Sequence, residues 1–199
     1  MKKLLSFIIF IFTALTTFAD NAAEARRALD KAAAKVSIKS GATANFSITG
    51  SKIGTQSGTI AIKGNKFCAR TGNATIWYNG KTQWMYNKKN DEVHVSTPTS
   101  AQQHQMNPYT FLSLYKSGYA MSLTNVASGQ QIHLTGKGKS ISEMYILLDK
   151  SYTIKQVKMK QRNGWVTINI TNFKASSLAD SSFSFNAKEH PKAEIIDLR

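Results

Sequence analysis

The chain has little of the residue types that build common reactive and cross-linked sites. Its 199 residues include one cysteine and four histidines. A single cysteine, Cys68, excludes an intramolecular disulfide, and we expect it to be a small buried hydrophobic residue. The histidines fall in no spacing typical of metal ligands or of a cysteine–histidine pair, and no Gly-x-Ser-x-Gly motif is present. The sequence therefore predicts a protein that is not an enzyme and that uses no metal or cofactor.

Acidic residues are also scarce. Eleven Asp and Glu residues stand against 26 Lys and Arg residues, which gives a formal net charge of +15. The basic residues are scattered, with no run of five and no arginine-rich arm. This distribution argues against a nucleic-acid partner and favours an anionic membrane surface or an acidic partner.

Long hydrophobic runs are absent except at the start, "MKKLLSFIIFIFTALTTFAD". Two lysines precede an apolar stretch, and Thr17-Phe18-Ala19 is typical of a cleavage site. We predict a signal peptide over residues 1–19, cleaved after Ala19, and a single domain over residues 20–199. The alternative is an uncleaved membrane anchor, but the apolar stretch is short for a span. Removal of Lys2 and Lys3 lowers the net charge to +13.

Residues 21–36, "NAAEARRALDKAAAKV", predict a helix with an apolar stripe at Ala25, Leu29, Ala32 and Val36. After it, short alternating runs recur between turn residues. These runs are "ANFSITG", "GTIAIKG", "KFCAR", "TIWY", "KTQWMY", "EVHVS", "QIHLTG", "SEMYILLD", "TIKQVKMKQR" and "WVTINITNF". They predict a large antiparallel sheet of ten or eleven strands.

Two Asn-Gly pairs predict type I′ hairpins. Asn79-Gly80 would pair Tyr78 with Lys81, and Asn163-Gly164 would pair Gln161 with Val166. The first hairpin is apolar on both faces, unlike the second. We assign Trp77, Trp84 and Tyr86 to one face, where they would pack under a neighbouring element or form a docking surface, and Ile76, Tyr78, Met85, Val93 and Val95 to the other.

The segment "NPYTFLSLYKSG", residues 107–118, interrupts the strands near their middle and predicts a second helix. Asn107 would cap it and Pro108 would occupy its first turn. Phe111, Leu112 and Tyr115 share one side. This helix could lie across the concave face of the sheet as a lid.

Several segments together resemble one protein family. They are "GTIAIKGNKFCAR", "TIWYNGKTQWMYNKKNDEVHV", "NPYTFLSLYKSGYAM" and "FSFNAKEHPKAEIIDLR". In this order they resemble the periplasmic outer-membrane lipoprotein carrier LolA, in its Bacteroidetes-type form. The resemblance implies a mainly β fold: an open, incomplete antiparallel β-barrel of about eleven strands, closed by the N-terminal helix and the lid helix.

The same resemblance implies a function and partners. A carrier of this family is a periplasmic monomer that holds the acyl chains of a lipoprotein in an apolar cavity. It receives the lipoprotein from an inner-membrane ABC transporter complex and delivers it to an outer-membrane acceptor. Two alternatives stay open: a periplasmic lipid or lipoprotein sensor on the same half-barrel, and a structural or adhesive β-domain.

The expected site consists of an acyl cavity and its lid. Many members of the family tether the lid through an arginine near an arginine–proline element. Here "KGNKFCAR" lacks the proline, and Arg70 is the only arginine available for this role. The alternative for each apolar residue is a plain core position. The expected cavity residues are Phe46, Ile48, Ile60, Ile62, Ile76, Met85, Val93, Val95, Val157, Met159, Ile168 and Ile170, and the expected lid residues are Pro108, Phe111, Leu112 and Tyr115.

Overall fold

The computed structural model describes residues 21–51, 54–99, 115–161 and 164–199. These residues form one helix, residues 21–36, and a twelve-stranded sheet. The strands are β1 (Ala42–Gly50), β2 (Gly54–Lys63), β3 (Lys66–Thr71), β4 (Ala74–Tyr78), β5 (Gln83–Asn87), β6 (Glu92–Ser96), β7 (Ala120–Val126), β8 (Gly129–Thr135), β9 (Glu143–Asp149), β10 (Ile154–Gln161), β11 (Gly164–Ala175) and β12 (Glu194–Asp197), with short 3-10 helices η1 (Asp180–Phe183) and η2 (Ala187–Glu189).

The sheet consists of two antiparallel meanders joined side by side. Strands β1 to β6 follow one another, as do β7 to β11, and β1 pairs with β11. Strand β12 is added parallel to β6, so β12 and β7 are the two edges and the sheet is not closed. The predicted mainly β fold with an open half-barrel and a helix is confirmed. The predicted lid helix, residues 107–118, lies mostly outside the described residues. Of this segment only residues 115–118 are described, and they form a turn.

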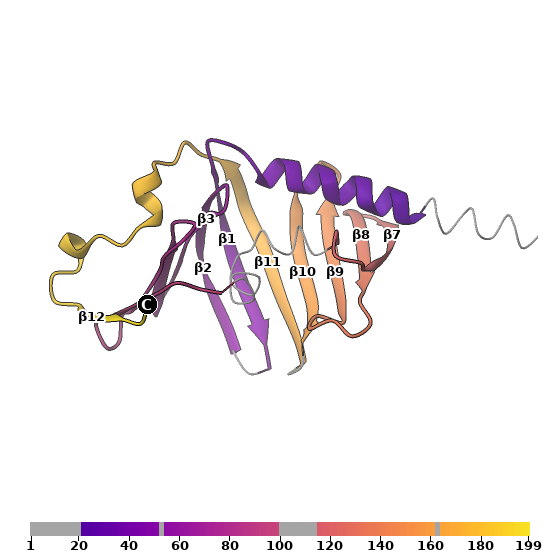
Figure 1. The fold of residues 1–199 in the computed structure, drawn as a ribbon. Helices are drawn as coiled ribbons and strands as arrows, with labels where there is room; N and C mark the ends of the chain where they lie inside the picture. The colour runs from indigo at the N-terminus through magenta and orange to yellow at the C-terminus, as the bar shows by residue number, and fades with distance from the viewer. Residues whose placement is uncertain (1–20, 52–53, 100–114, 162–163) are drawn as a thin grey trace, which may run out of the picture.

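The N-terminal helix lies across the ends of β11, β10, β9 and β8 (Figure 1). Three residues of its predicted stripe, Ala25, Leu29 and Ala32, are inaccessible to solvent, and the fourth, Val36, is half-buried. They pack in one hydrophobic cluster with residues of β8, β9 and β10. Asn21 fixes the start of the helix to β7, because its amide donates to Leu123 O at 3.0 Å and accepts from Leu123 N at 2.7 Å. We call the sheet face under this helix the inner face.

Both predicted hairpin registers are wrong, because each residue pairs two positions away from its predicted partner. In the first hairpin Asn79 N donates to Thr82 O at 3.2 Å, so Gly80 and Lys81 occupy the centre of the turn. The Asn79 side chain accepts from Thr82 N at 2.8 Å, which holds Asn79 outside the centre. Gly80 alone takes the positive φ, +97°. The slip changes no face, because a shift by an even number of residues keeps each side chain on its side.

In the second hairpin the strands pair Gln161 with Gly164 and Met159 with Val166. The prediction pairs Gln161 with Val166. The observed partner of Gln161 is thus two residues nearer the turn than predicted, whereas in the first hairpin the observed partner of Tyr78 is two residues farther from it. Again the apolar residues stay together on the inner face.

The placement of Val93 and Val95 is a larger correction. Val93 pairs with Tyr86 and Val95 with Trp84, so both valines lie on the outer face and not with Ile76. Asn87 pairs with Glu92 across residues 88–91, an even number of loop residues. An odd number would have put the valines on the predicted face, since side chains alternate along a strand.

The outer face of β3 to β6 is covered by the C-terminal segment that carries η1, η2 and β12 (Figure 1). Phe183 of η1 packs on Cys68 and Trp77, and all three are buried. Burial raises the pKa of the Cys68 thiol. His190 lies 4.3 Å from the ring of Tyr86, centroid to centroid. The aromatic residues of this face thus pack under a neighbouring element, the first of the two predicted alternatives.

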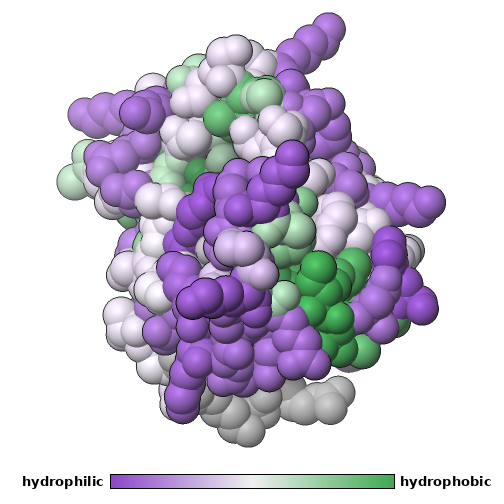
Figure 2. Space-filling view, turned by 90° about the vertical axis from the view of Figure 1, so that its left-hand side faces the viewer, coloured by the Kyte–Doolittle hydropathy of each residue, from purple (hydrophilic) through white to green (hydrophobic). Residues whose placement is uncertain are grey.

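Polar contacts complete this cover. Asp180 of η1 lies 3.1 Å from Lys63 Nζ and 2.8 Å from Lys66 Nζ, and these lysines lower the pKa of its carboxyl. The side of the molecule formed by this segment is mostly hydrophilic, with a compact apolar area (Figure 2).

Candidate ligand cavity

A cavity of about 370 Å³ lies on the inner face, between the sheet and the C-terminal half of the helix. Its volume is within the range of about 300–1,000 Å³ typical of small-molecule sites. Most of its wall is aliphatic or aromatic. It is lined by Ala32, Lys35, Val36, Ala44, Phe46, Ile48, Gln56, Ile60, Ile62, Phe67, Ala69, Thr71, Ala74, Ile76, Tyr152, Thr153, Ile154, Ile168, Ile170 and Phe173.

The alternation of β1 and β11 builds the centre of this wall. Phe46 pairs with Ile170 and Ile48 with Ile168, so two apolar pairs stand side by side on the inner face. On its other side Phe46 faces Gly58 of β2. A Cβ at Gly58 would lie 2.0 Å from Arg70 O and 3.0 Å from Phe46 Cζ. Glycine at this position therefore allows the backbone of β3 to approach closely at Arg70, and it also leaves space for the Phe46 ring.

Seven of the twelve predicted cavity residues lie in this wall, and their role in holding a ligand stays a prediction. All but one are isoleucines, which come from β1, β2, β4 and β11, and the exception is the phenylalanine of β1. The seven are Phe46, Ile48, Ile60, Ile62, Ile76, Ile168 and Ile170.

The other five predicted residues do not line the cavity. Val157 and Met159 do lie on the inner face, but the helix covers them and leaves 3% and 1% of their surface exposed. They are core residues. Met85 shares the face of Ile76 but stands 37% exposed, beyond the cavity wall. Val93 and Val95 lie on the outer face, as described above.

Sequence reasoning missed several lining residues. The helix contributes Ala32 and Val36, whose stripe was predicted without a role in the cavity. Ala69 follows the outer-face residue Cys68 on β3. Alternation along the strand therefore places Ala69 on the inner face and could have identified it as a lining residue. The polar residues Tyr152 and Thr153 come from the loop before β10 and gave no signal.

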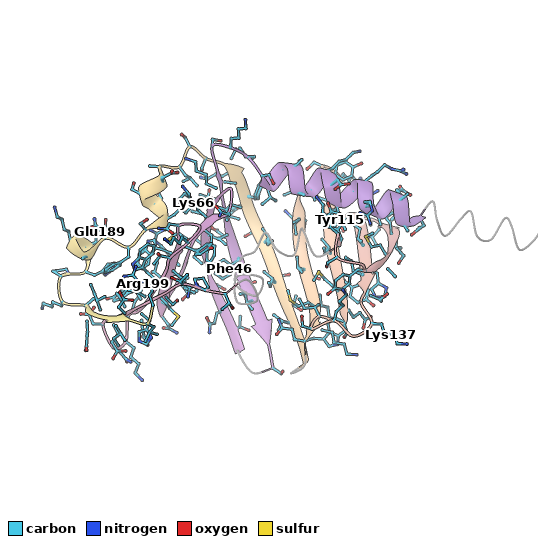
Figure 3. All side chains as sticks on the ribbon, in the orientation of Figure 1. Phe46, Lys66, Tyr115, Lys137, Glu189 and Arg199 are labelled. Atoms are coloured by element: carbon cyan, nitrogen blue, oxygen red, sulfur yellow. The ribbon has the colours of Figure 1, made fainter. Side chains whose placement is uncertain are left out.

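Of the predicted lid residues, only Tyr115 is described; Pro108, Phe111 and Leu112 lie outside the described residues. Tyr115 lies under the helix, away from Phe46 (Figure 3). It is 1% exposed, belongs to the helix cluster and does not line the cavity. Its hydroxyl donates to the Asp30 carboxylate of the helix. Burial, and then this hydrogen bond, raise the pKa of Tyr115.

Arg70 is exposed on the outer face, because it alternates with the cavity residue Ala69 and pairs with Thr75. This side of the sheet is turned away from the cavity. Its role as a tether of the lid stays a prediction, and its position argues against that role.

Two lysines of the helix contact the loop before β10; Lys35 lines the cavity, and Lys31 lines a smaller pocket beside it. Lys35 Nζ donates to Thr153 Oγ1 at 3.4 Å, and Lys31 Nζ donates to Tyr152 OH at 3.2 Å. Lys31 Nζ also lies 4.4 Å from the centre of the Tyr152 ring. The apolar wall of the cavity thus ends at a polar edge that carries one cation, Lys35.

The described part of the chain shows neither a cluster of three or more His, Cys, Asp or Glu residues placed to bind a metal nor a helix with the length and apolar character needed to cross a membrane.

Solved structures with a similar fold share little sequence with this chain. An uncharacterized conserved protein from Thermus thermophilus has a TM-score of 0.61 and 11% identity, over 87% of this chain and 99% of its own. A LolA superfamily protein from Nitrosomonas europaea has a TM-score of 0.42 and 11% identity, over 81% and 97%. Curated proteins gave no match.

A family model gives the assignment. The model of the outer membrane lipoprotein carrier protein LolA matches residues 15–164, about three quarters of the chain. This match includes the helix, β1 to β10 and most of the cavity wall. It agrees with the open sheet and the resemblance seen in the sequence. The chain therefore belongs to the LolA lipoprotein carrier family.

Proposed function

We propose that this protein is a periplasmic carrier of acylated lipoproteins. Residues 1–19 direct it to the periplasm, and residues 20–199 form one carrier domain. It takes a lipoprotein from an inner-membrane ABC transporter complex and passes it to an outer-membrane acceptor. The observation that carries this proposal is the cavity, about 370 Å³ with a mostly apolar wall, in a member of a carrier family.

The energetics of the acyl chain explain why such a cavity is needed. Each methylene transferred from apolar surroundings to water raises the free energy by roughly 0.8 kcal/mol. A chain of about fifteen carbons therefore opposes passage through water by roughly 12 kcal/mol. A wall of isoleucine and phenylalanine side chains offsets this penalty. The carrier does no covalent chemistry, so no catalytic residue is assigned.

The cavity stays open enough for release. Its wall residues Phe46, Ile48 and Ile60 are half-buried, whereas the residues under the helix are fully buried. An acyl chain could therefore enter and leave without unfolding the helix cluster. A carrier needs this exchange, because cargo that binds irreversibly would never reach its acceptor.

The test is to purify the full chain from the periplasm of a bacterium with an outer membrane, extract it with organic solvent and analyse the extract by mass spectrometry. We expect acyl-bearing molecules, including intact lipoprotein, in the purified material. Extracts without acyl groups would contradict the proposal. A lipid ligand without any lipoprotein, and capture of a regulatory membrane protein instead, would favour the sensor.

A further inference from the structure

Carboxylates are rare in one long part of the chain. Residues 93–179 contain nine Lys and Arg residues but only two carboxylates, Glu143 and Asp149. Asp149 ends β9 on the side of the helix, so Glu143 alone lies at the opposite ends of β7 to β11 among the described residues. Its carboxylate accepts from Tyr145 OH at 2.8 Å and lies 3.1 Å from His133 Nε2. One carboxylate therefore faces the whole positive charge of this end.

Five lysines gather there, at the ends of the strands that lie away from the helix (Figure 1), which we call the far end. They come from the turn before β7, the loop between β8 and β9, and the last residues of β10. All five are exposed. In the described part of the chain, the lysines with ion pairs are Lys63 and Lys66, both with Asp180, and none of these five has one. The five are Lys116, Lys137, Lys139, Lys158 and Lys160.

Strand pairing and one hydrogen bond join these lysines into a single patch. Lys160 pairs with Glu143 at the start of β9. The loop that ends just before β9 carries Lys137 and Lys139, and Figure 3 shows Lys137 at the far end. Lys139 Nζ donates to Ser117 O at 2.9 Å, which holds this loop against the turn before β7.

One aromatic side chain, Trp165, lies among the lysines on the outer face. The centre of its ring is 4.8 Å from Lys158 Nζ and 6.0 Å from Lys160 Nζ. The ring is half-buried, and the C-terminal segment covers other strands, β3 to β6. Tryptophan favours the level of lipid head groups, and lysine can lay its apolar stem along such a ring while its ammonium reaches a phosphate.

The residue type of the cations favours a membrane over a protein partner. Protein interfaces are depleted in lysine and enriched in arginine, which binds a carboxylate in fixed two-point geometry. The described residues of the patch include five lysines and no arginine. Lysine is a compact charge on a flexible stem, and clusters of basic residues are attracted to the negative potential of an anionic lipid surface.

We propose that the far-end patch, the five lysines and Trp165, docks the protein on an anionic phospholipid surface. Docking there brings the cavity near the membrane. Ile168 of the cavity wall lies three residues from Trp165 on β11, which is about 10 Å along a strand. The path of an acyl chain through water would thus be short. The inference adds a membrane surface to the proposed function and does not require that the cavity hold an acyl chain.

The test measures co-sedimentation of the protein, purified from the periplasm, with vesicles that contain no lipoprotein. One set contains one-third phosphatidylglycerol in phosphatidylcholine, and the other is phosphatidylcholine alone. We expect at least about tenfold stronger binding to the anionic vesicles. The difference should shrink as salt is raised, because exposed charges are screened. Equal binding to both sets would overturn the inference, since acyl chains entering the cavity would give that result without any role for charge.

Two double variants with the same change of charge locate the surface. K137Q/K139Q removes two lysines of the patch. K188Q/K192Q removes two exposed lysines of the C-terminal segment, whose Glu189 lies far from Lys137 in Figure 3. We expect the first to bind anionic vesicles at least about tenfold more weakly and the second to bind almost as the unchanged protein does. An equal loss in both, with folding confirmed by circular dichroism, would show that net charge alone attracts the protein and would overturn the inference.

Trp165 gives a readout that net charge cannot imitate. Brominated phosphatidylglycerol quenches the fluorescence of a tryptophan that reaches the lipid. We expect it to quench the unchanged protein, and Trp165→Phe to lose most of this quenching, because Trp77 and Trp84 lie on the other half of the sheet and belong to the cluster under the C-terminal segment. Quenching retained in Trp165→Phe would place the membrane on a different surface and overturn the proposal.

An acidic protein is the other partner that this patch could attract. Titration with a soluble polyglutamate peptide tests it, at the same concentration of negative charge as the vesicles. We expect binding at least about tenfold weaker than to anionic vesicles, because the peptide offers Trp165 no lipid interface. Binding as tight as to vesicles, and lost in K137Q/K139Q, would assign the patch to an acidic protein and overturn the membrane inference. Failure here leaves lipoprotein carriage untouched, since no lipoprotein is present.

Discussion

Ile60 and Thr59 are adjacent residues of β2 with opposite surroundings. Ile60 lines the cavity, and Thr59 is exposed on the outer face. A carboxylate at position 60 would stand against an apolar wall, where desolvation costs several kcal/mol. We expect Ile60→Glu to bind an environment-sensitive hydrophobic dye at least tenfold more weakly. Fluorescence titration measures this effect.

Thr59→Glu is the matched control, with the same new charge on the same strand. It should bind the dye as the unchanged protein does. Equal dye binding by the two variants, both shown to be folded by circular dichroism, would remove Ile60 from the cavity.

Tyr115 offers a test of the contact between the helix and the segment before β7. Its hydroxyl donates to the Asp30 carboxylate, and a hydrogen bond to a charged group contributes about 1.5–3 kcal/mol. Tyr115→Phe should therefore lower the free energy of unfolding by about this amount at pH 8, as measured by urea denaturation.

The pH dependence of this variant has a definite sign. Because the pKa of Tyr115 is raised in the folded protein, its stabilising effect is complete below the ordinary tyrosine pKa near 10. Above that pH the unfolded chain loses the proton first and stability falls. The unchanged protein should thus lose more stability than Tyr115→Phe between pH 9 and 11. Parallel pH profiles would contradict this account.

At single positions, alternation predicted the correct face for most residues. It succeeded for Phe46, Ile48 and Ile168, because each lies within one continuous strand whose residues alternate between the two faces. It failed for Val93, where the face depends on whether an even or odd number of residues fills the preceding loop. It also could not separate cavity from core: Met159 and Ile168 share the inner face, and only the position of the helix distinguishes them.

Among the elements, the C-terminal segment has the clearest structural role. Phe183 of η1 is inaccessible to solvent and covers Cys68. Phe183→Ala should lower the free energy of unfolding by about 3–5 kcal/mol, the range for truncating a buried phenylalanine. It should also open a path to the Cys68 thiol, which we expect to be unreactive in the folded parent protein.

The measurement combines thermal unfolding with the rate of labelling by a thiol reagent. Ile195→Ala in β12 is the control, because Ile195 is 53% exposed and its truncation should change stability little. A Phe183→Ala variant as stable as this control, with Cys68 still protected, would show that η1 does not cover the outer face.

The elements that the sequence failed to predict are the two sheet edges. The runs that formed the basis of the prediction omit β7 and β12. Strand β7 is exposed at five of its seven positions, so apolar and polar residues do not alternate cleanly. Strand β12 has four residues and pairs in parallel with β6, a contact far apart in sequence that no turn signal marks. The strands between these edges, each paired with a strand on both sides, showed a clearer alternation of apolar and polar residues.

At the scale of the whole molecule, the half of the sheet around β4 and β5 is apolar on both sides because each side is covered differently. The inner face there borders the cavity, and the outer face lies under the C-terminal segment. The half around β10 has one covered face only, and its outer face carries Lys158 and Lys160 beside Trp165. Sequence patterns predicted this difference between the halves, but not the identity of the cover.

The central claim is that this cavity holds lipoprotein acyl chains in water. The most direct measurement is the release of a radiolabelled lipoprotein from inner-membrane vesicles that contain the ABC transporter complex, with ATP and the purified full chain added. We predict soluble lipoprotein in complex with the unchanged protein and with Thr59→Glu, and little with Ile60→Glu. Release that is equal for all three proteins, or absent for the unchanged protein while a known carrier succeeds in the same vesicles, would contradict the account.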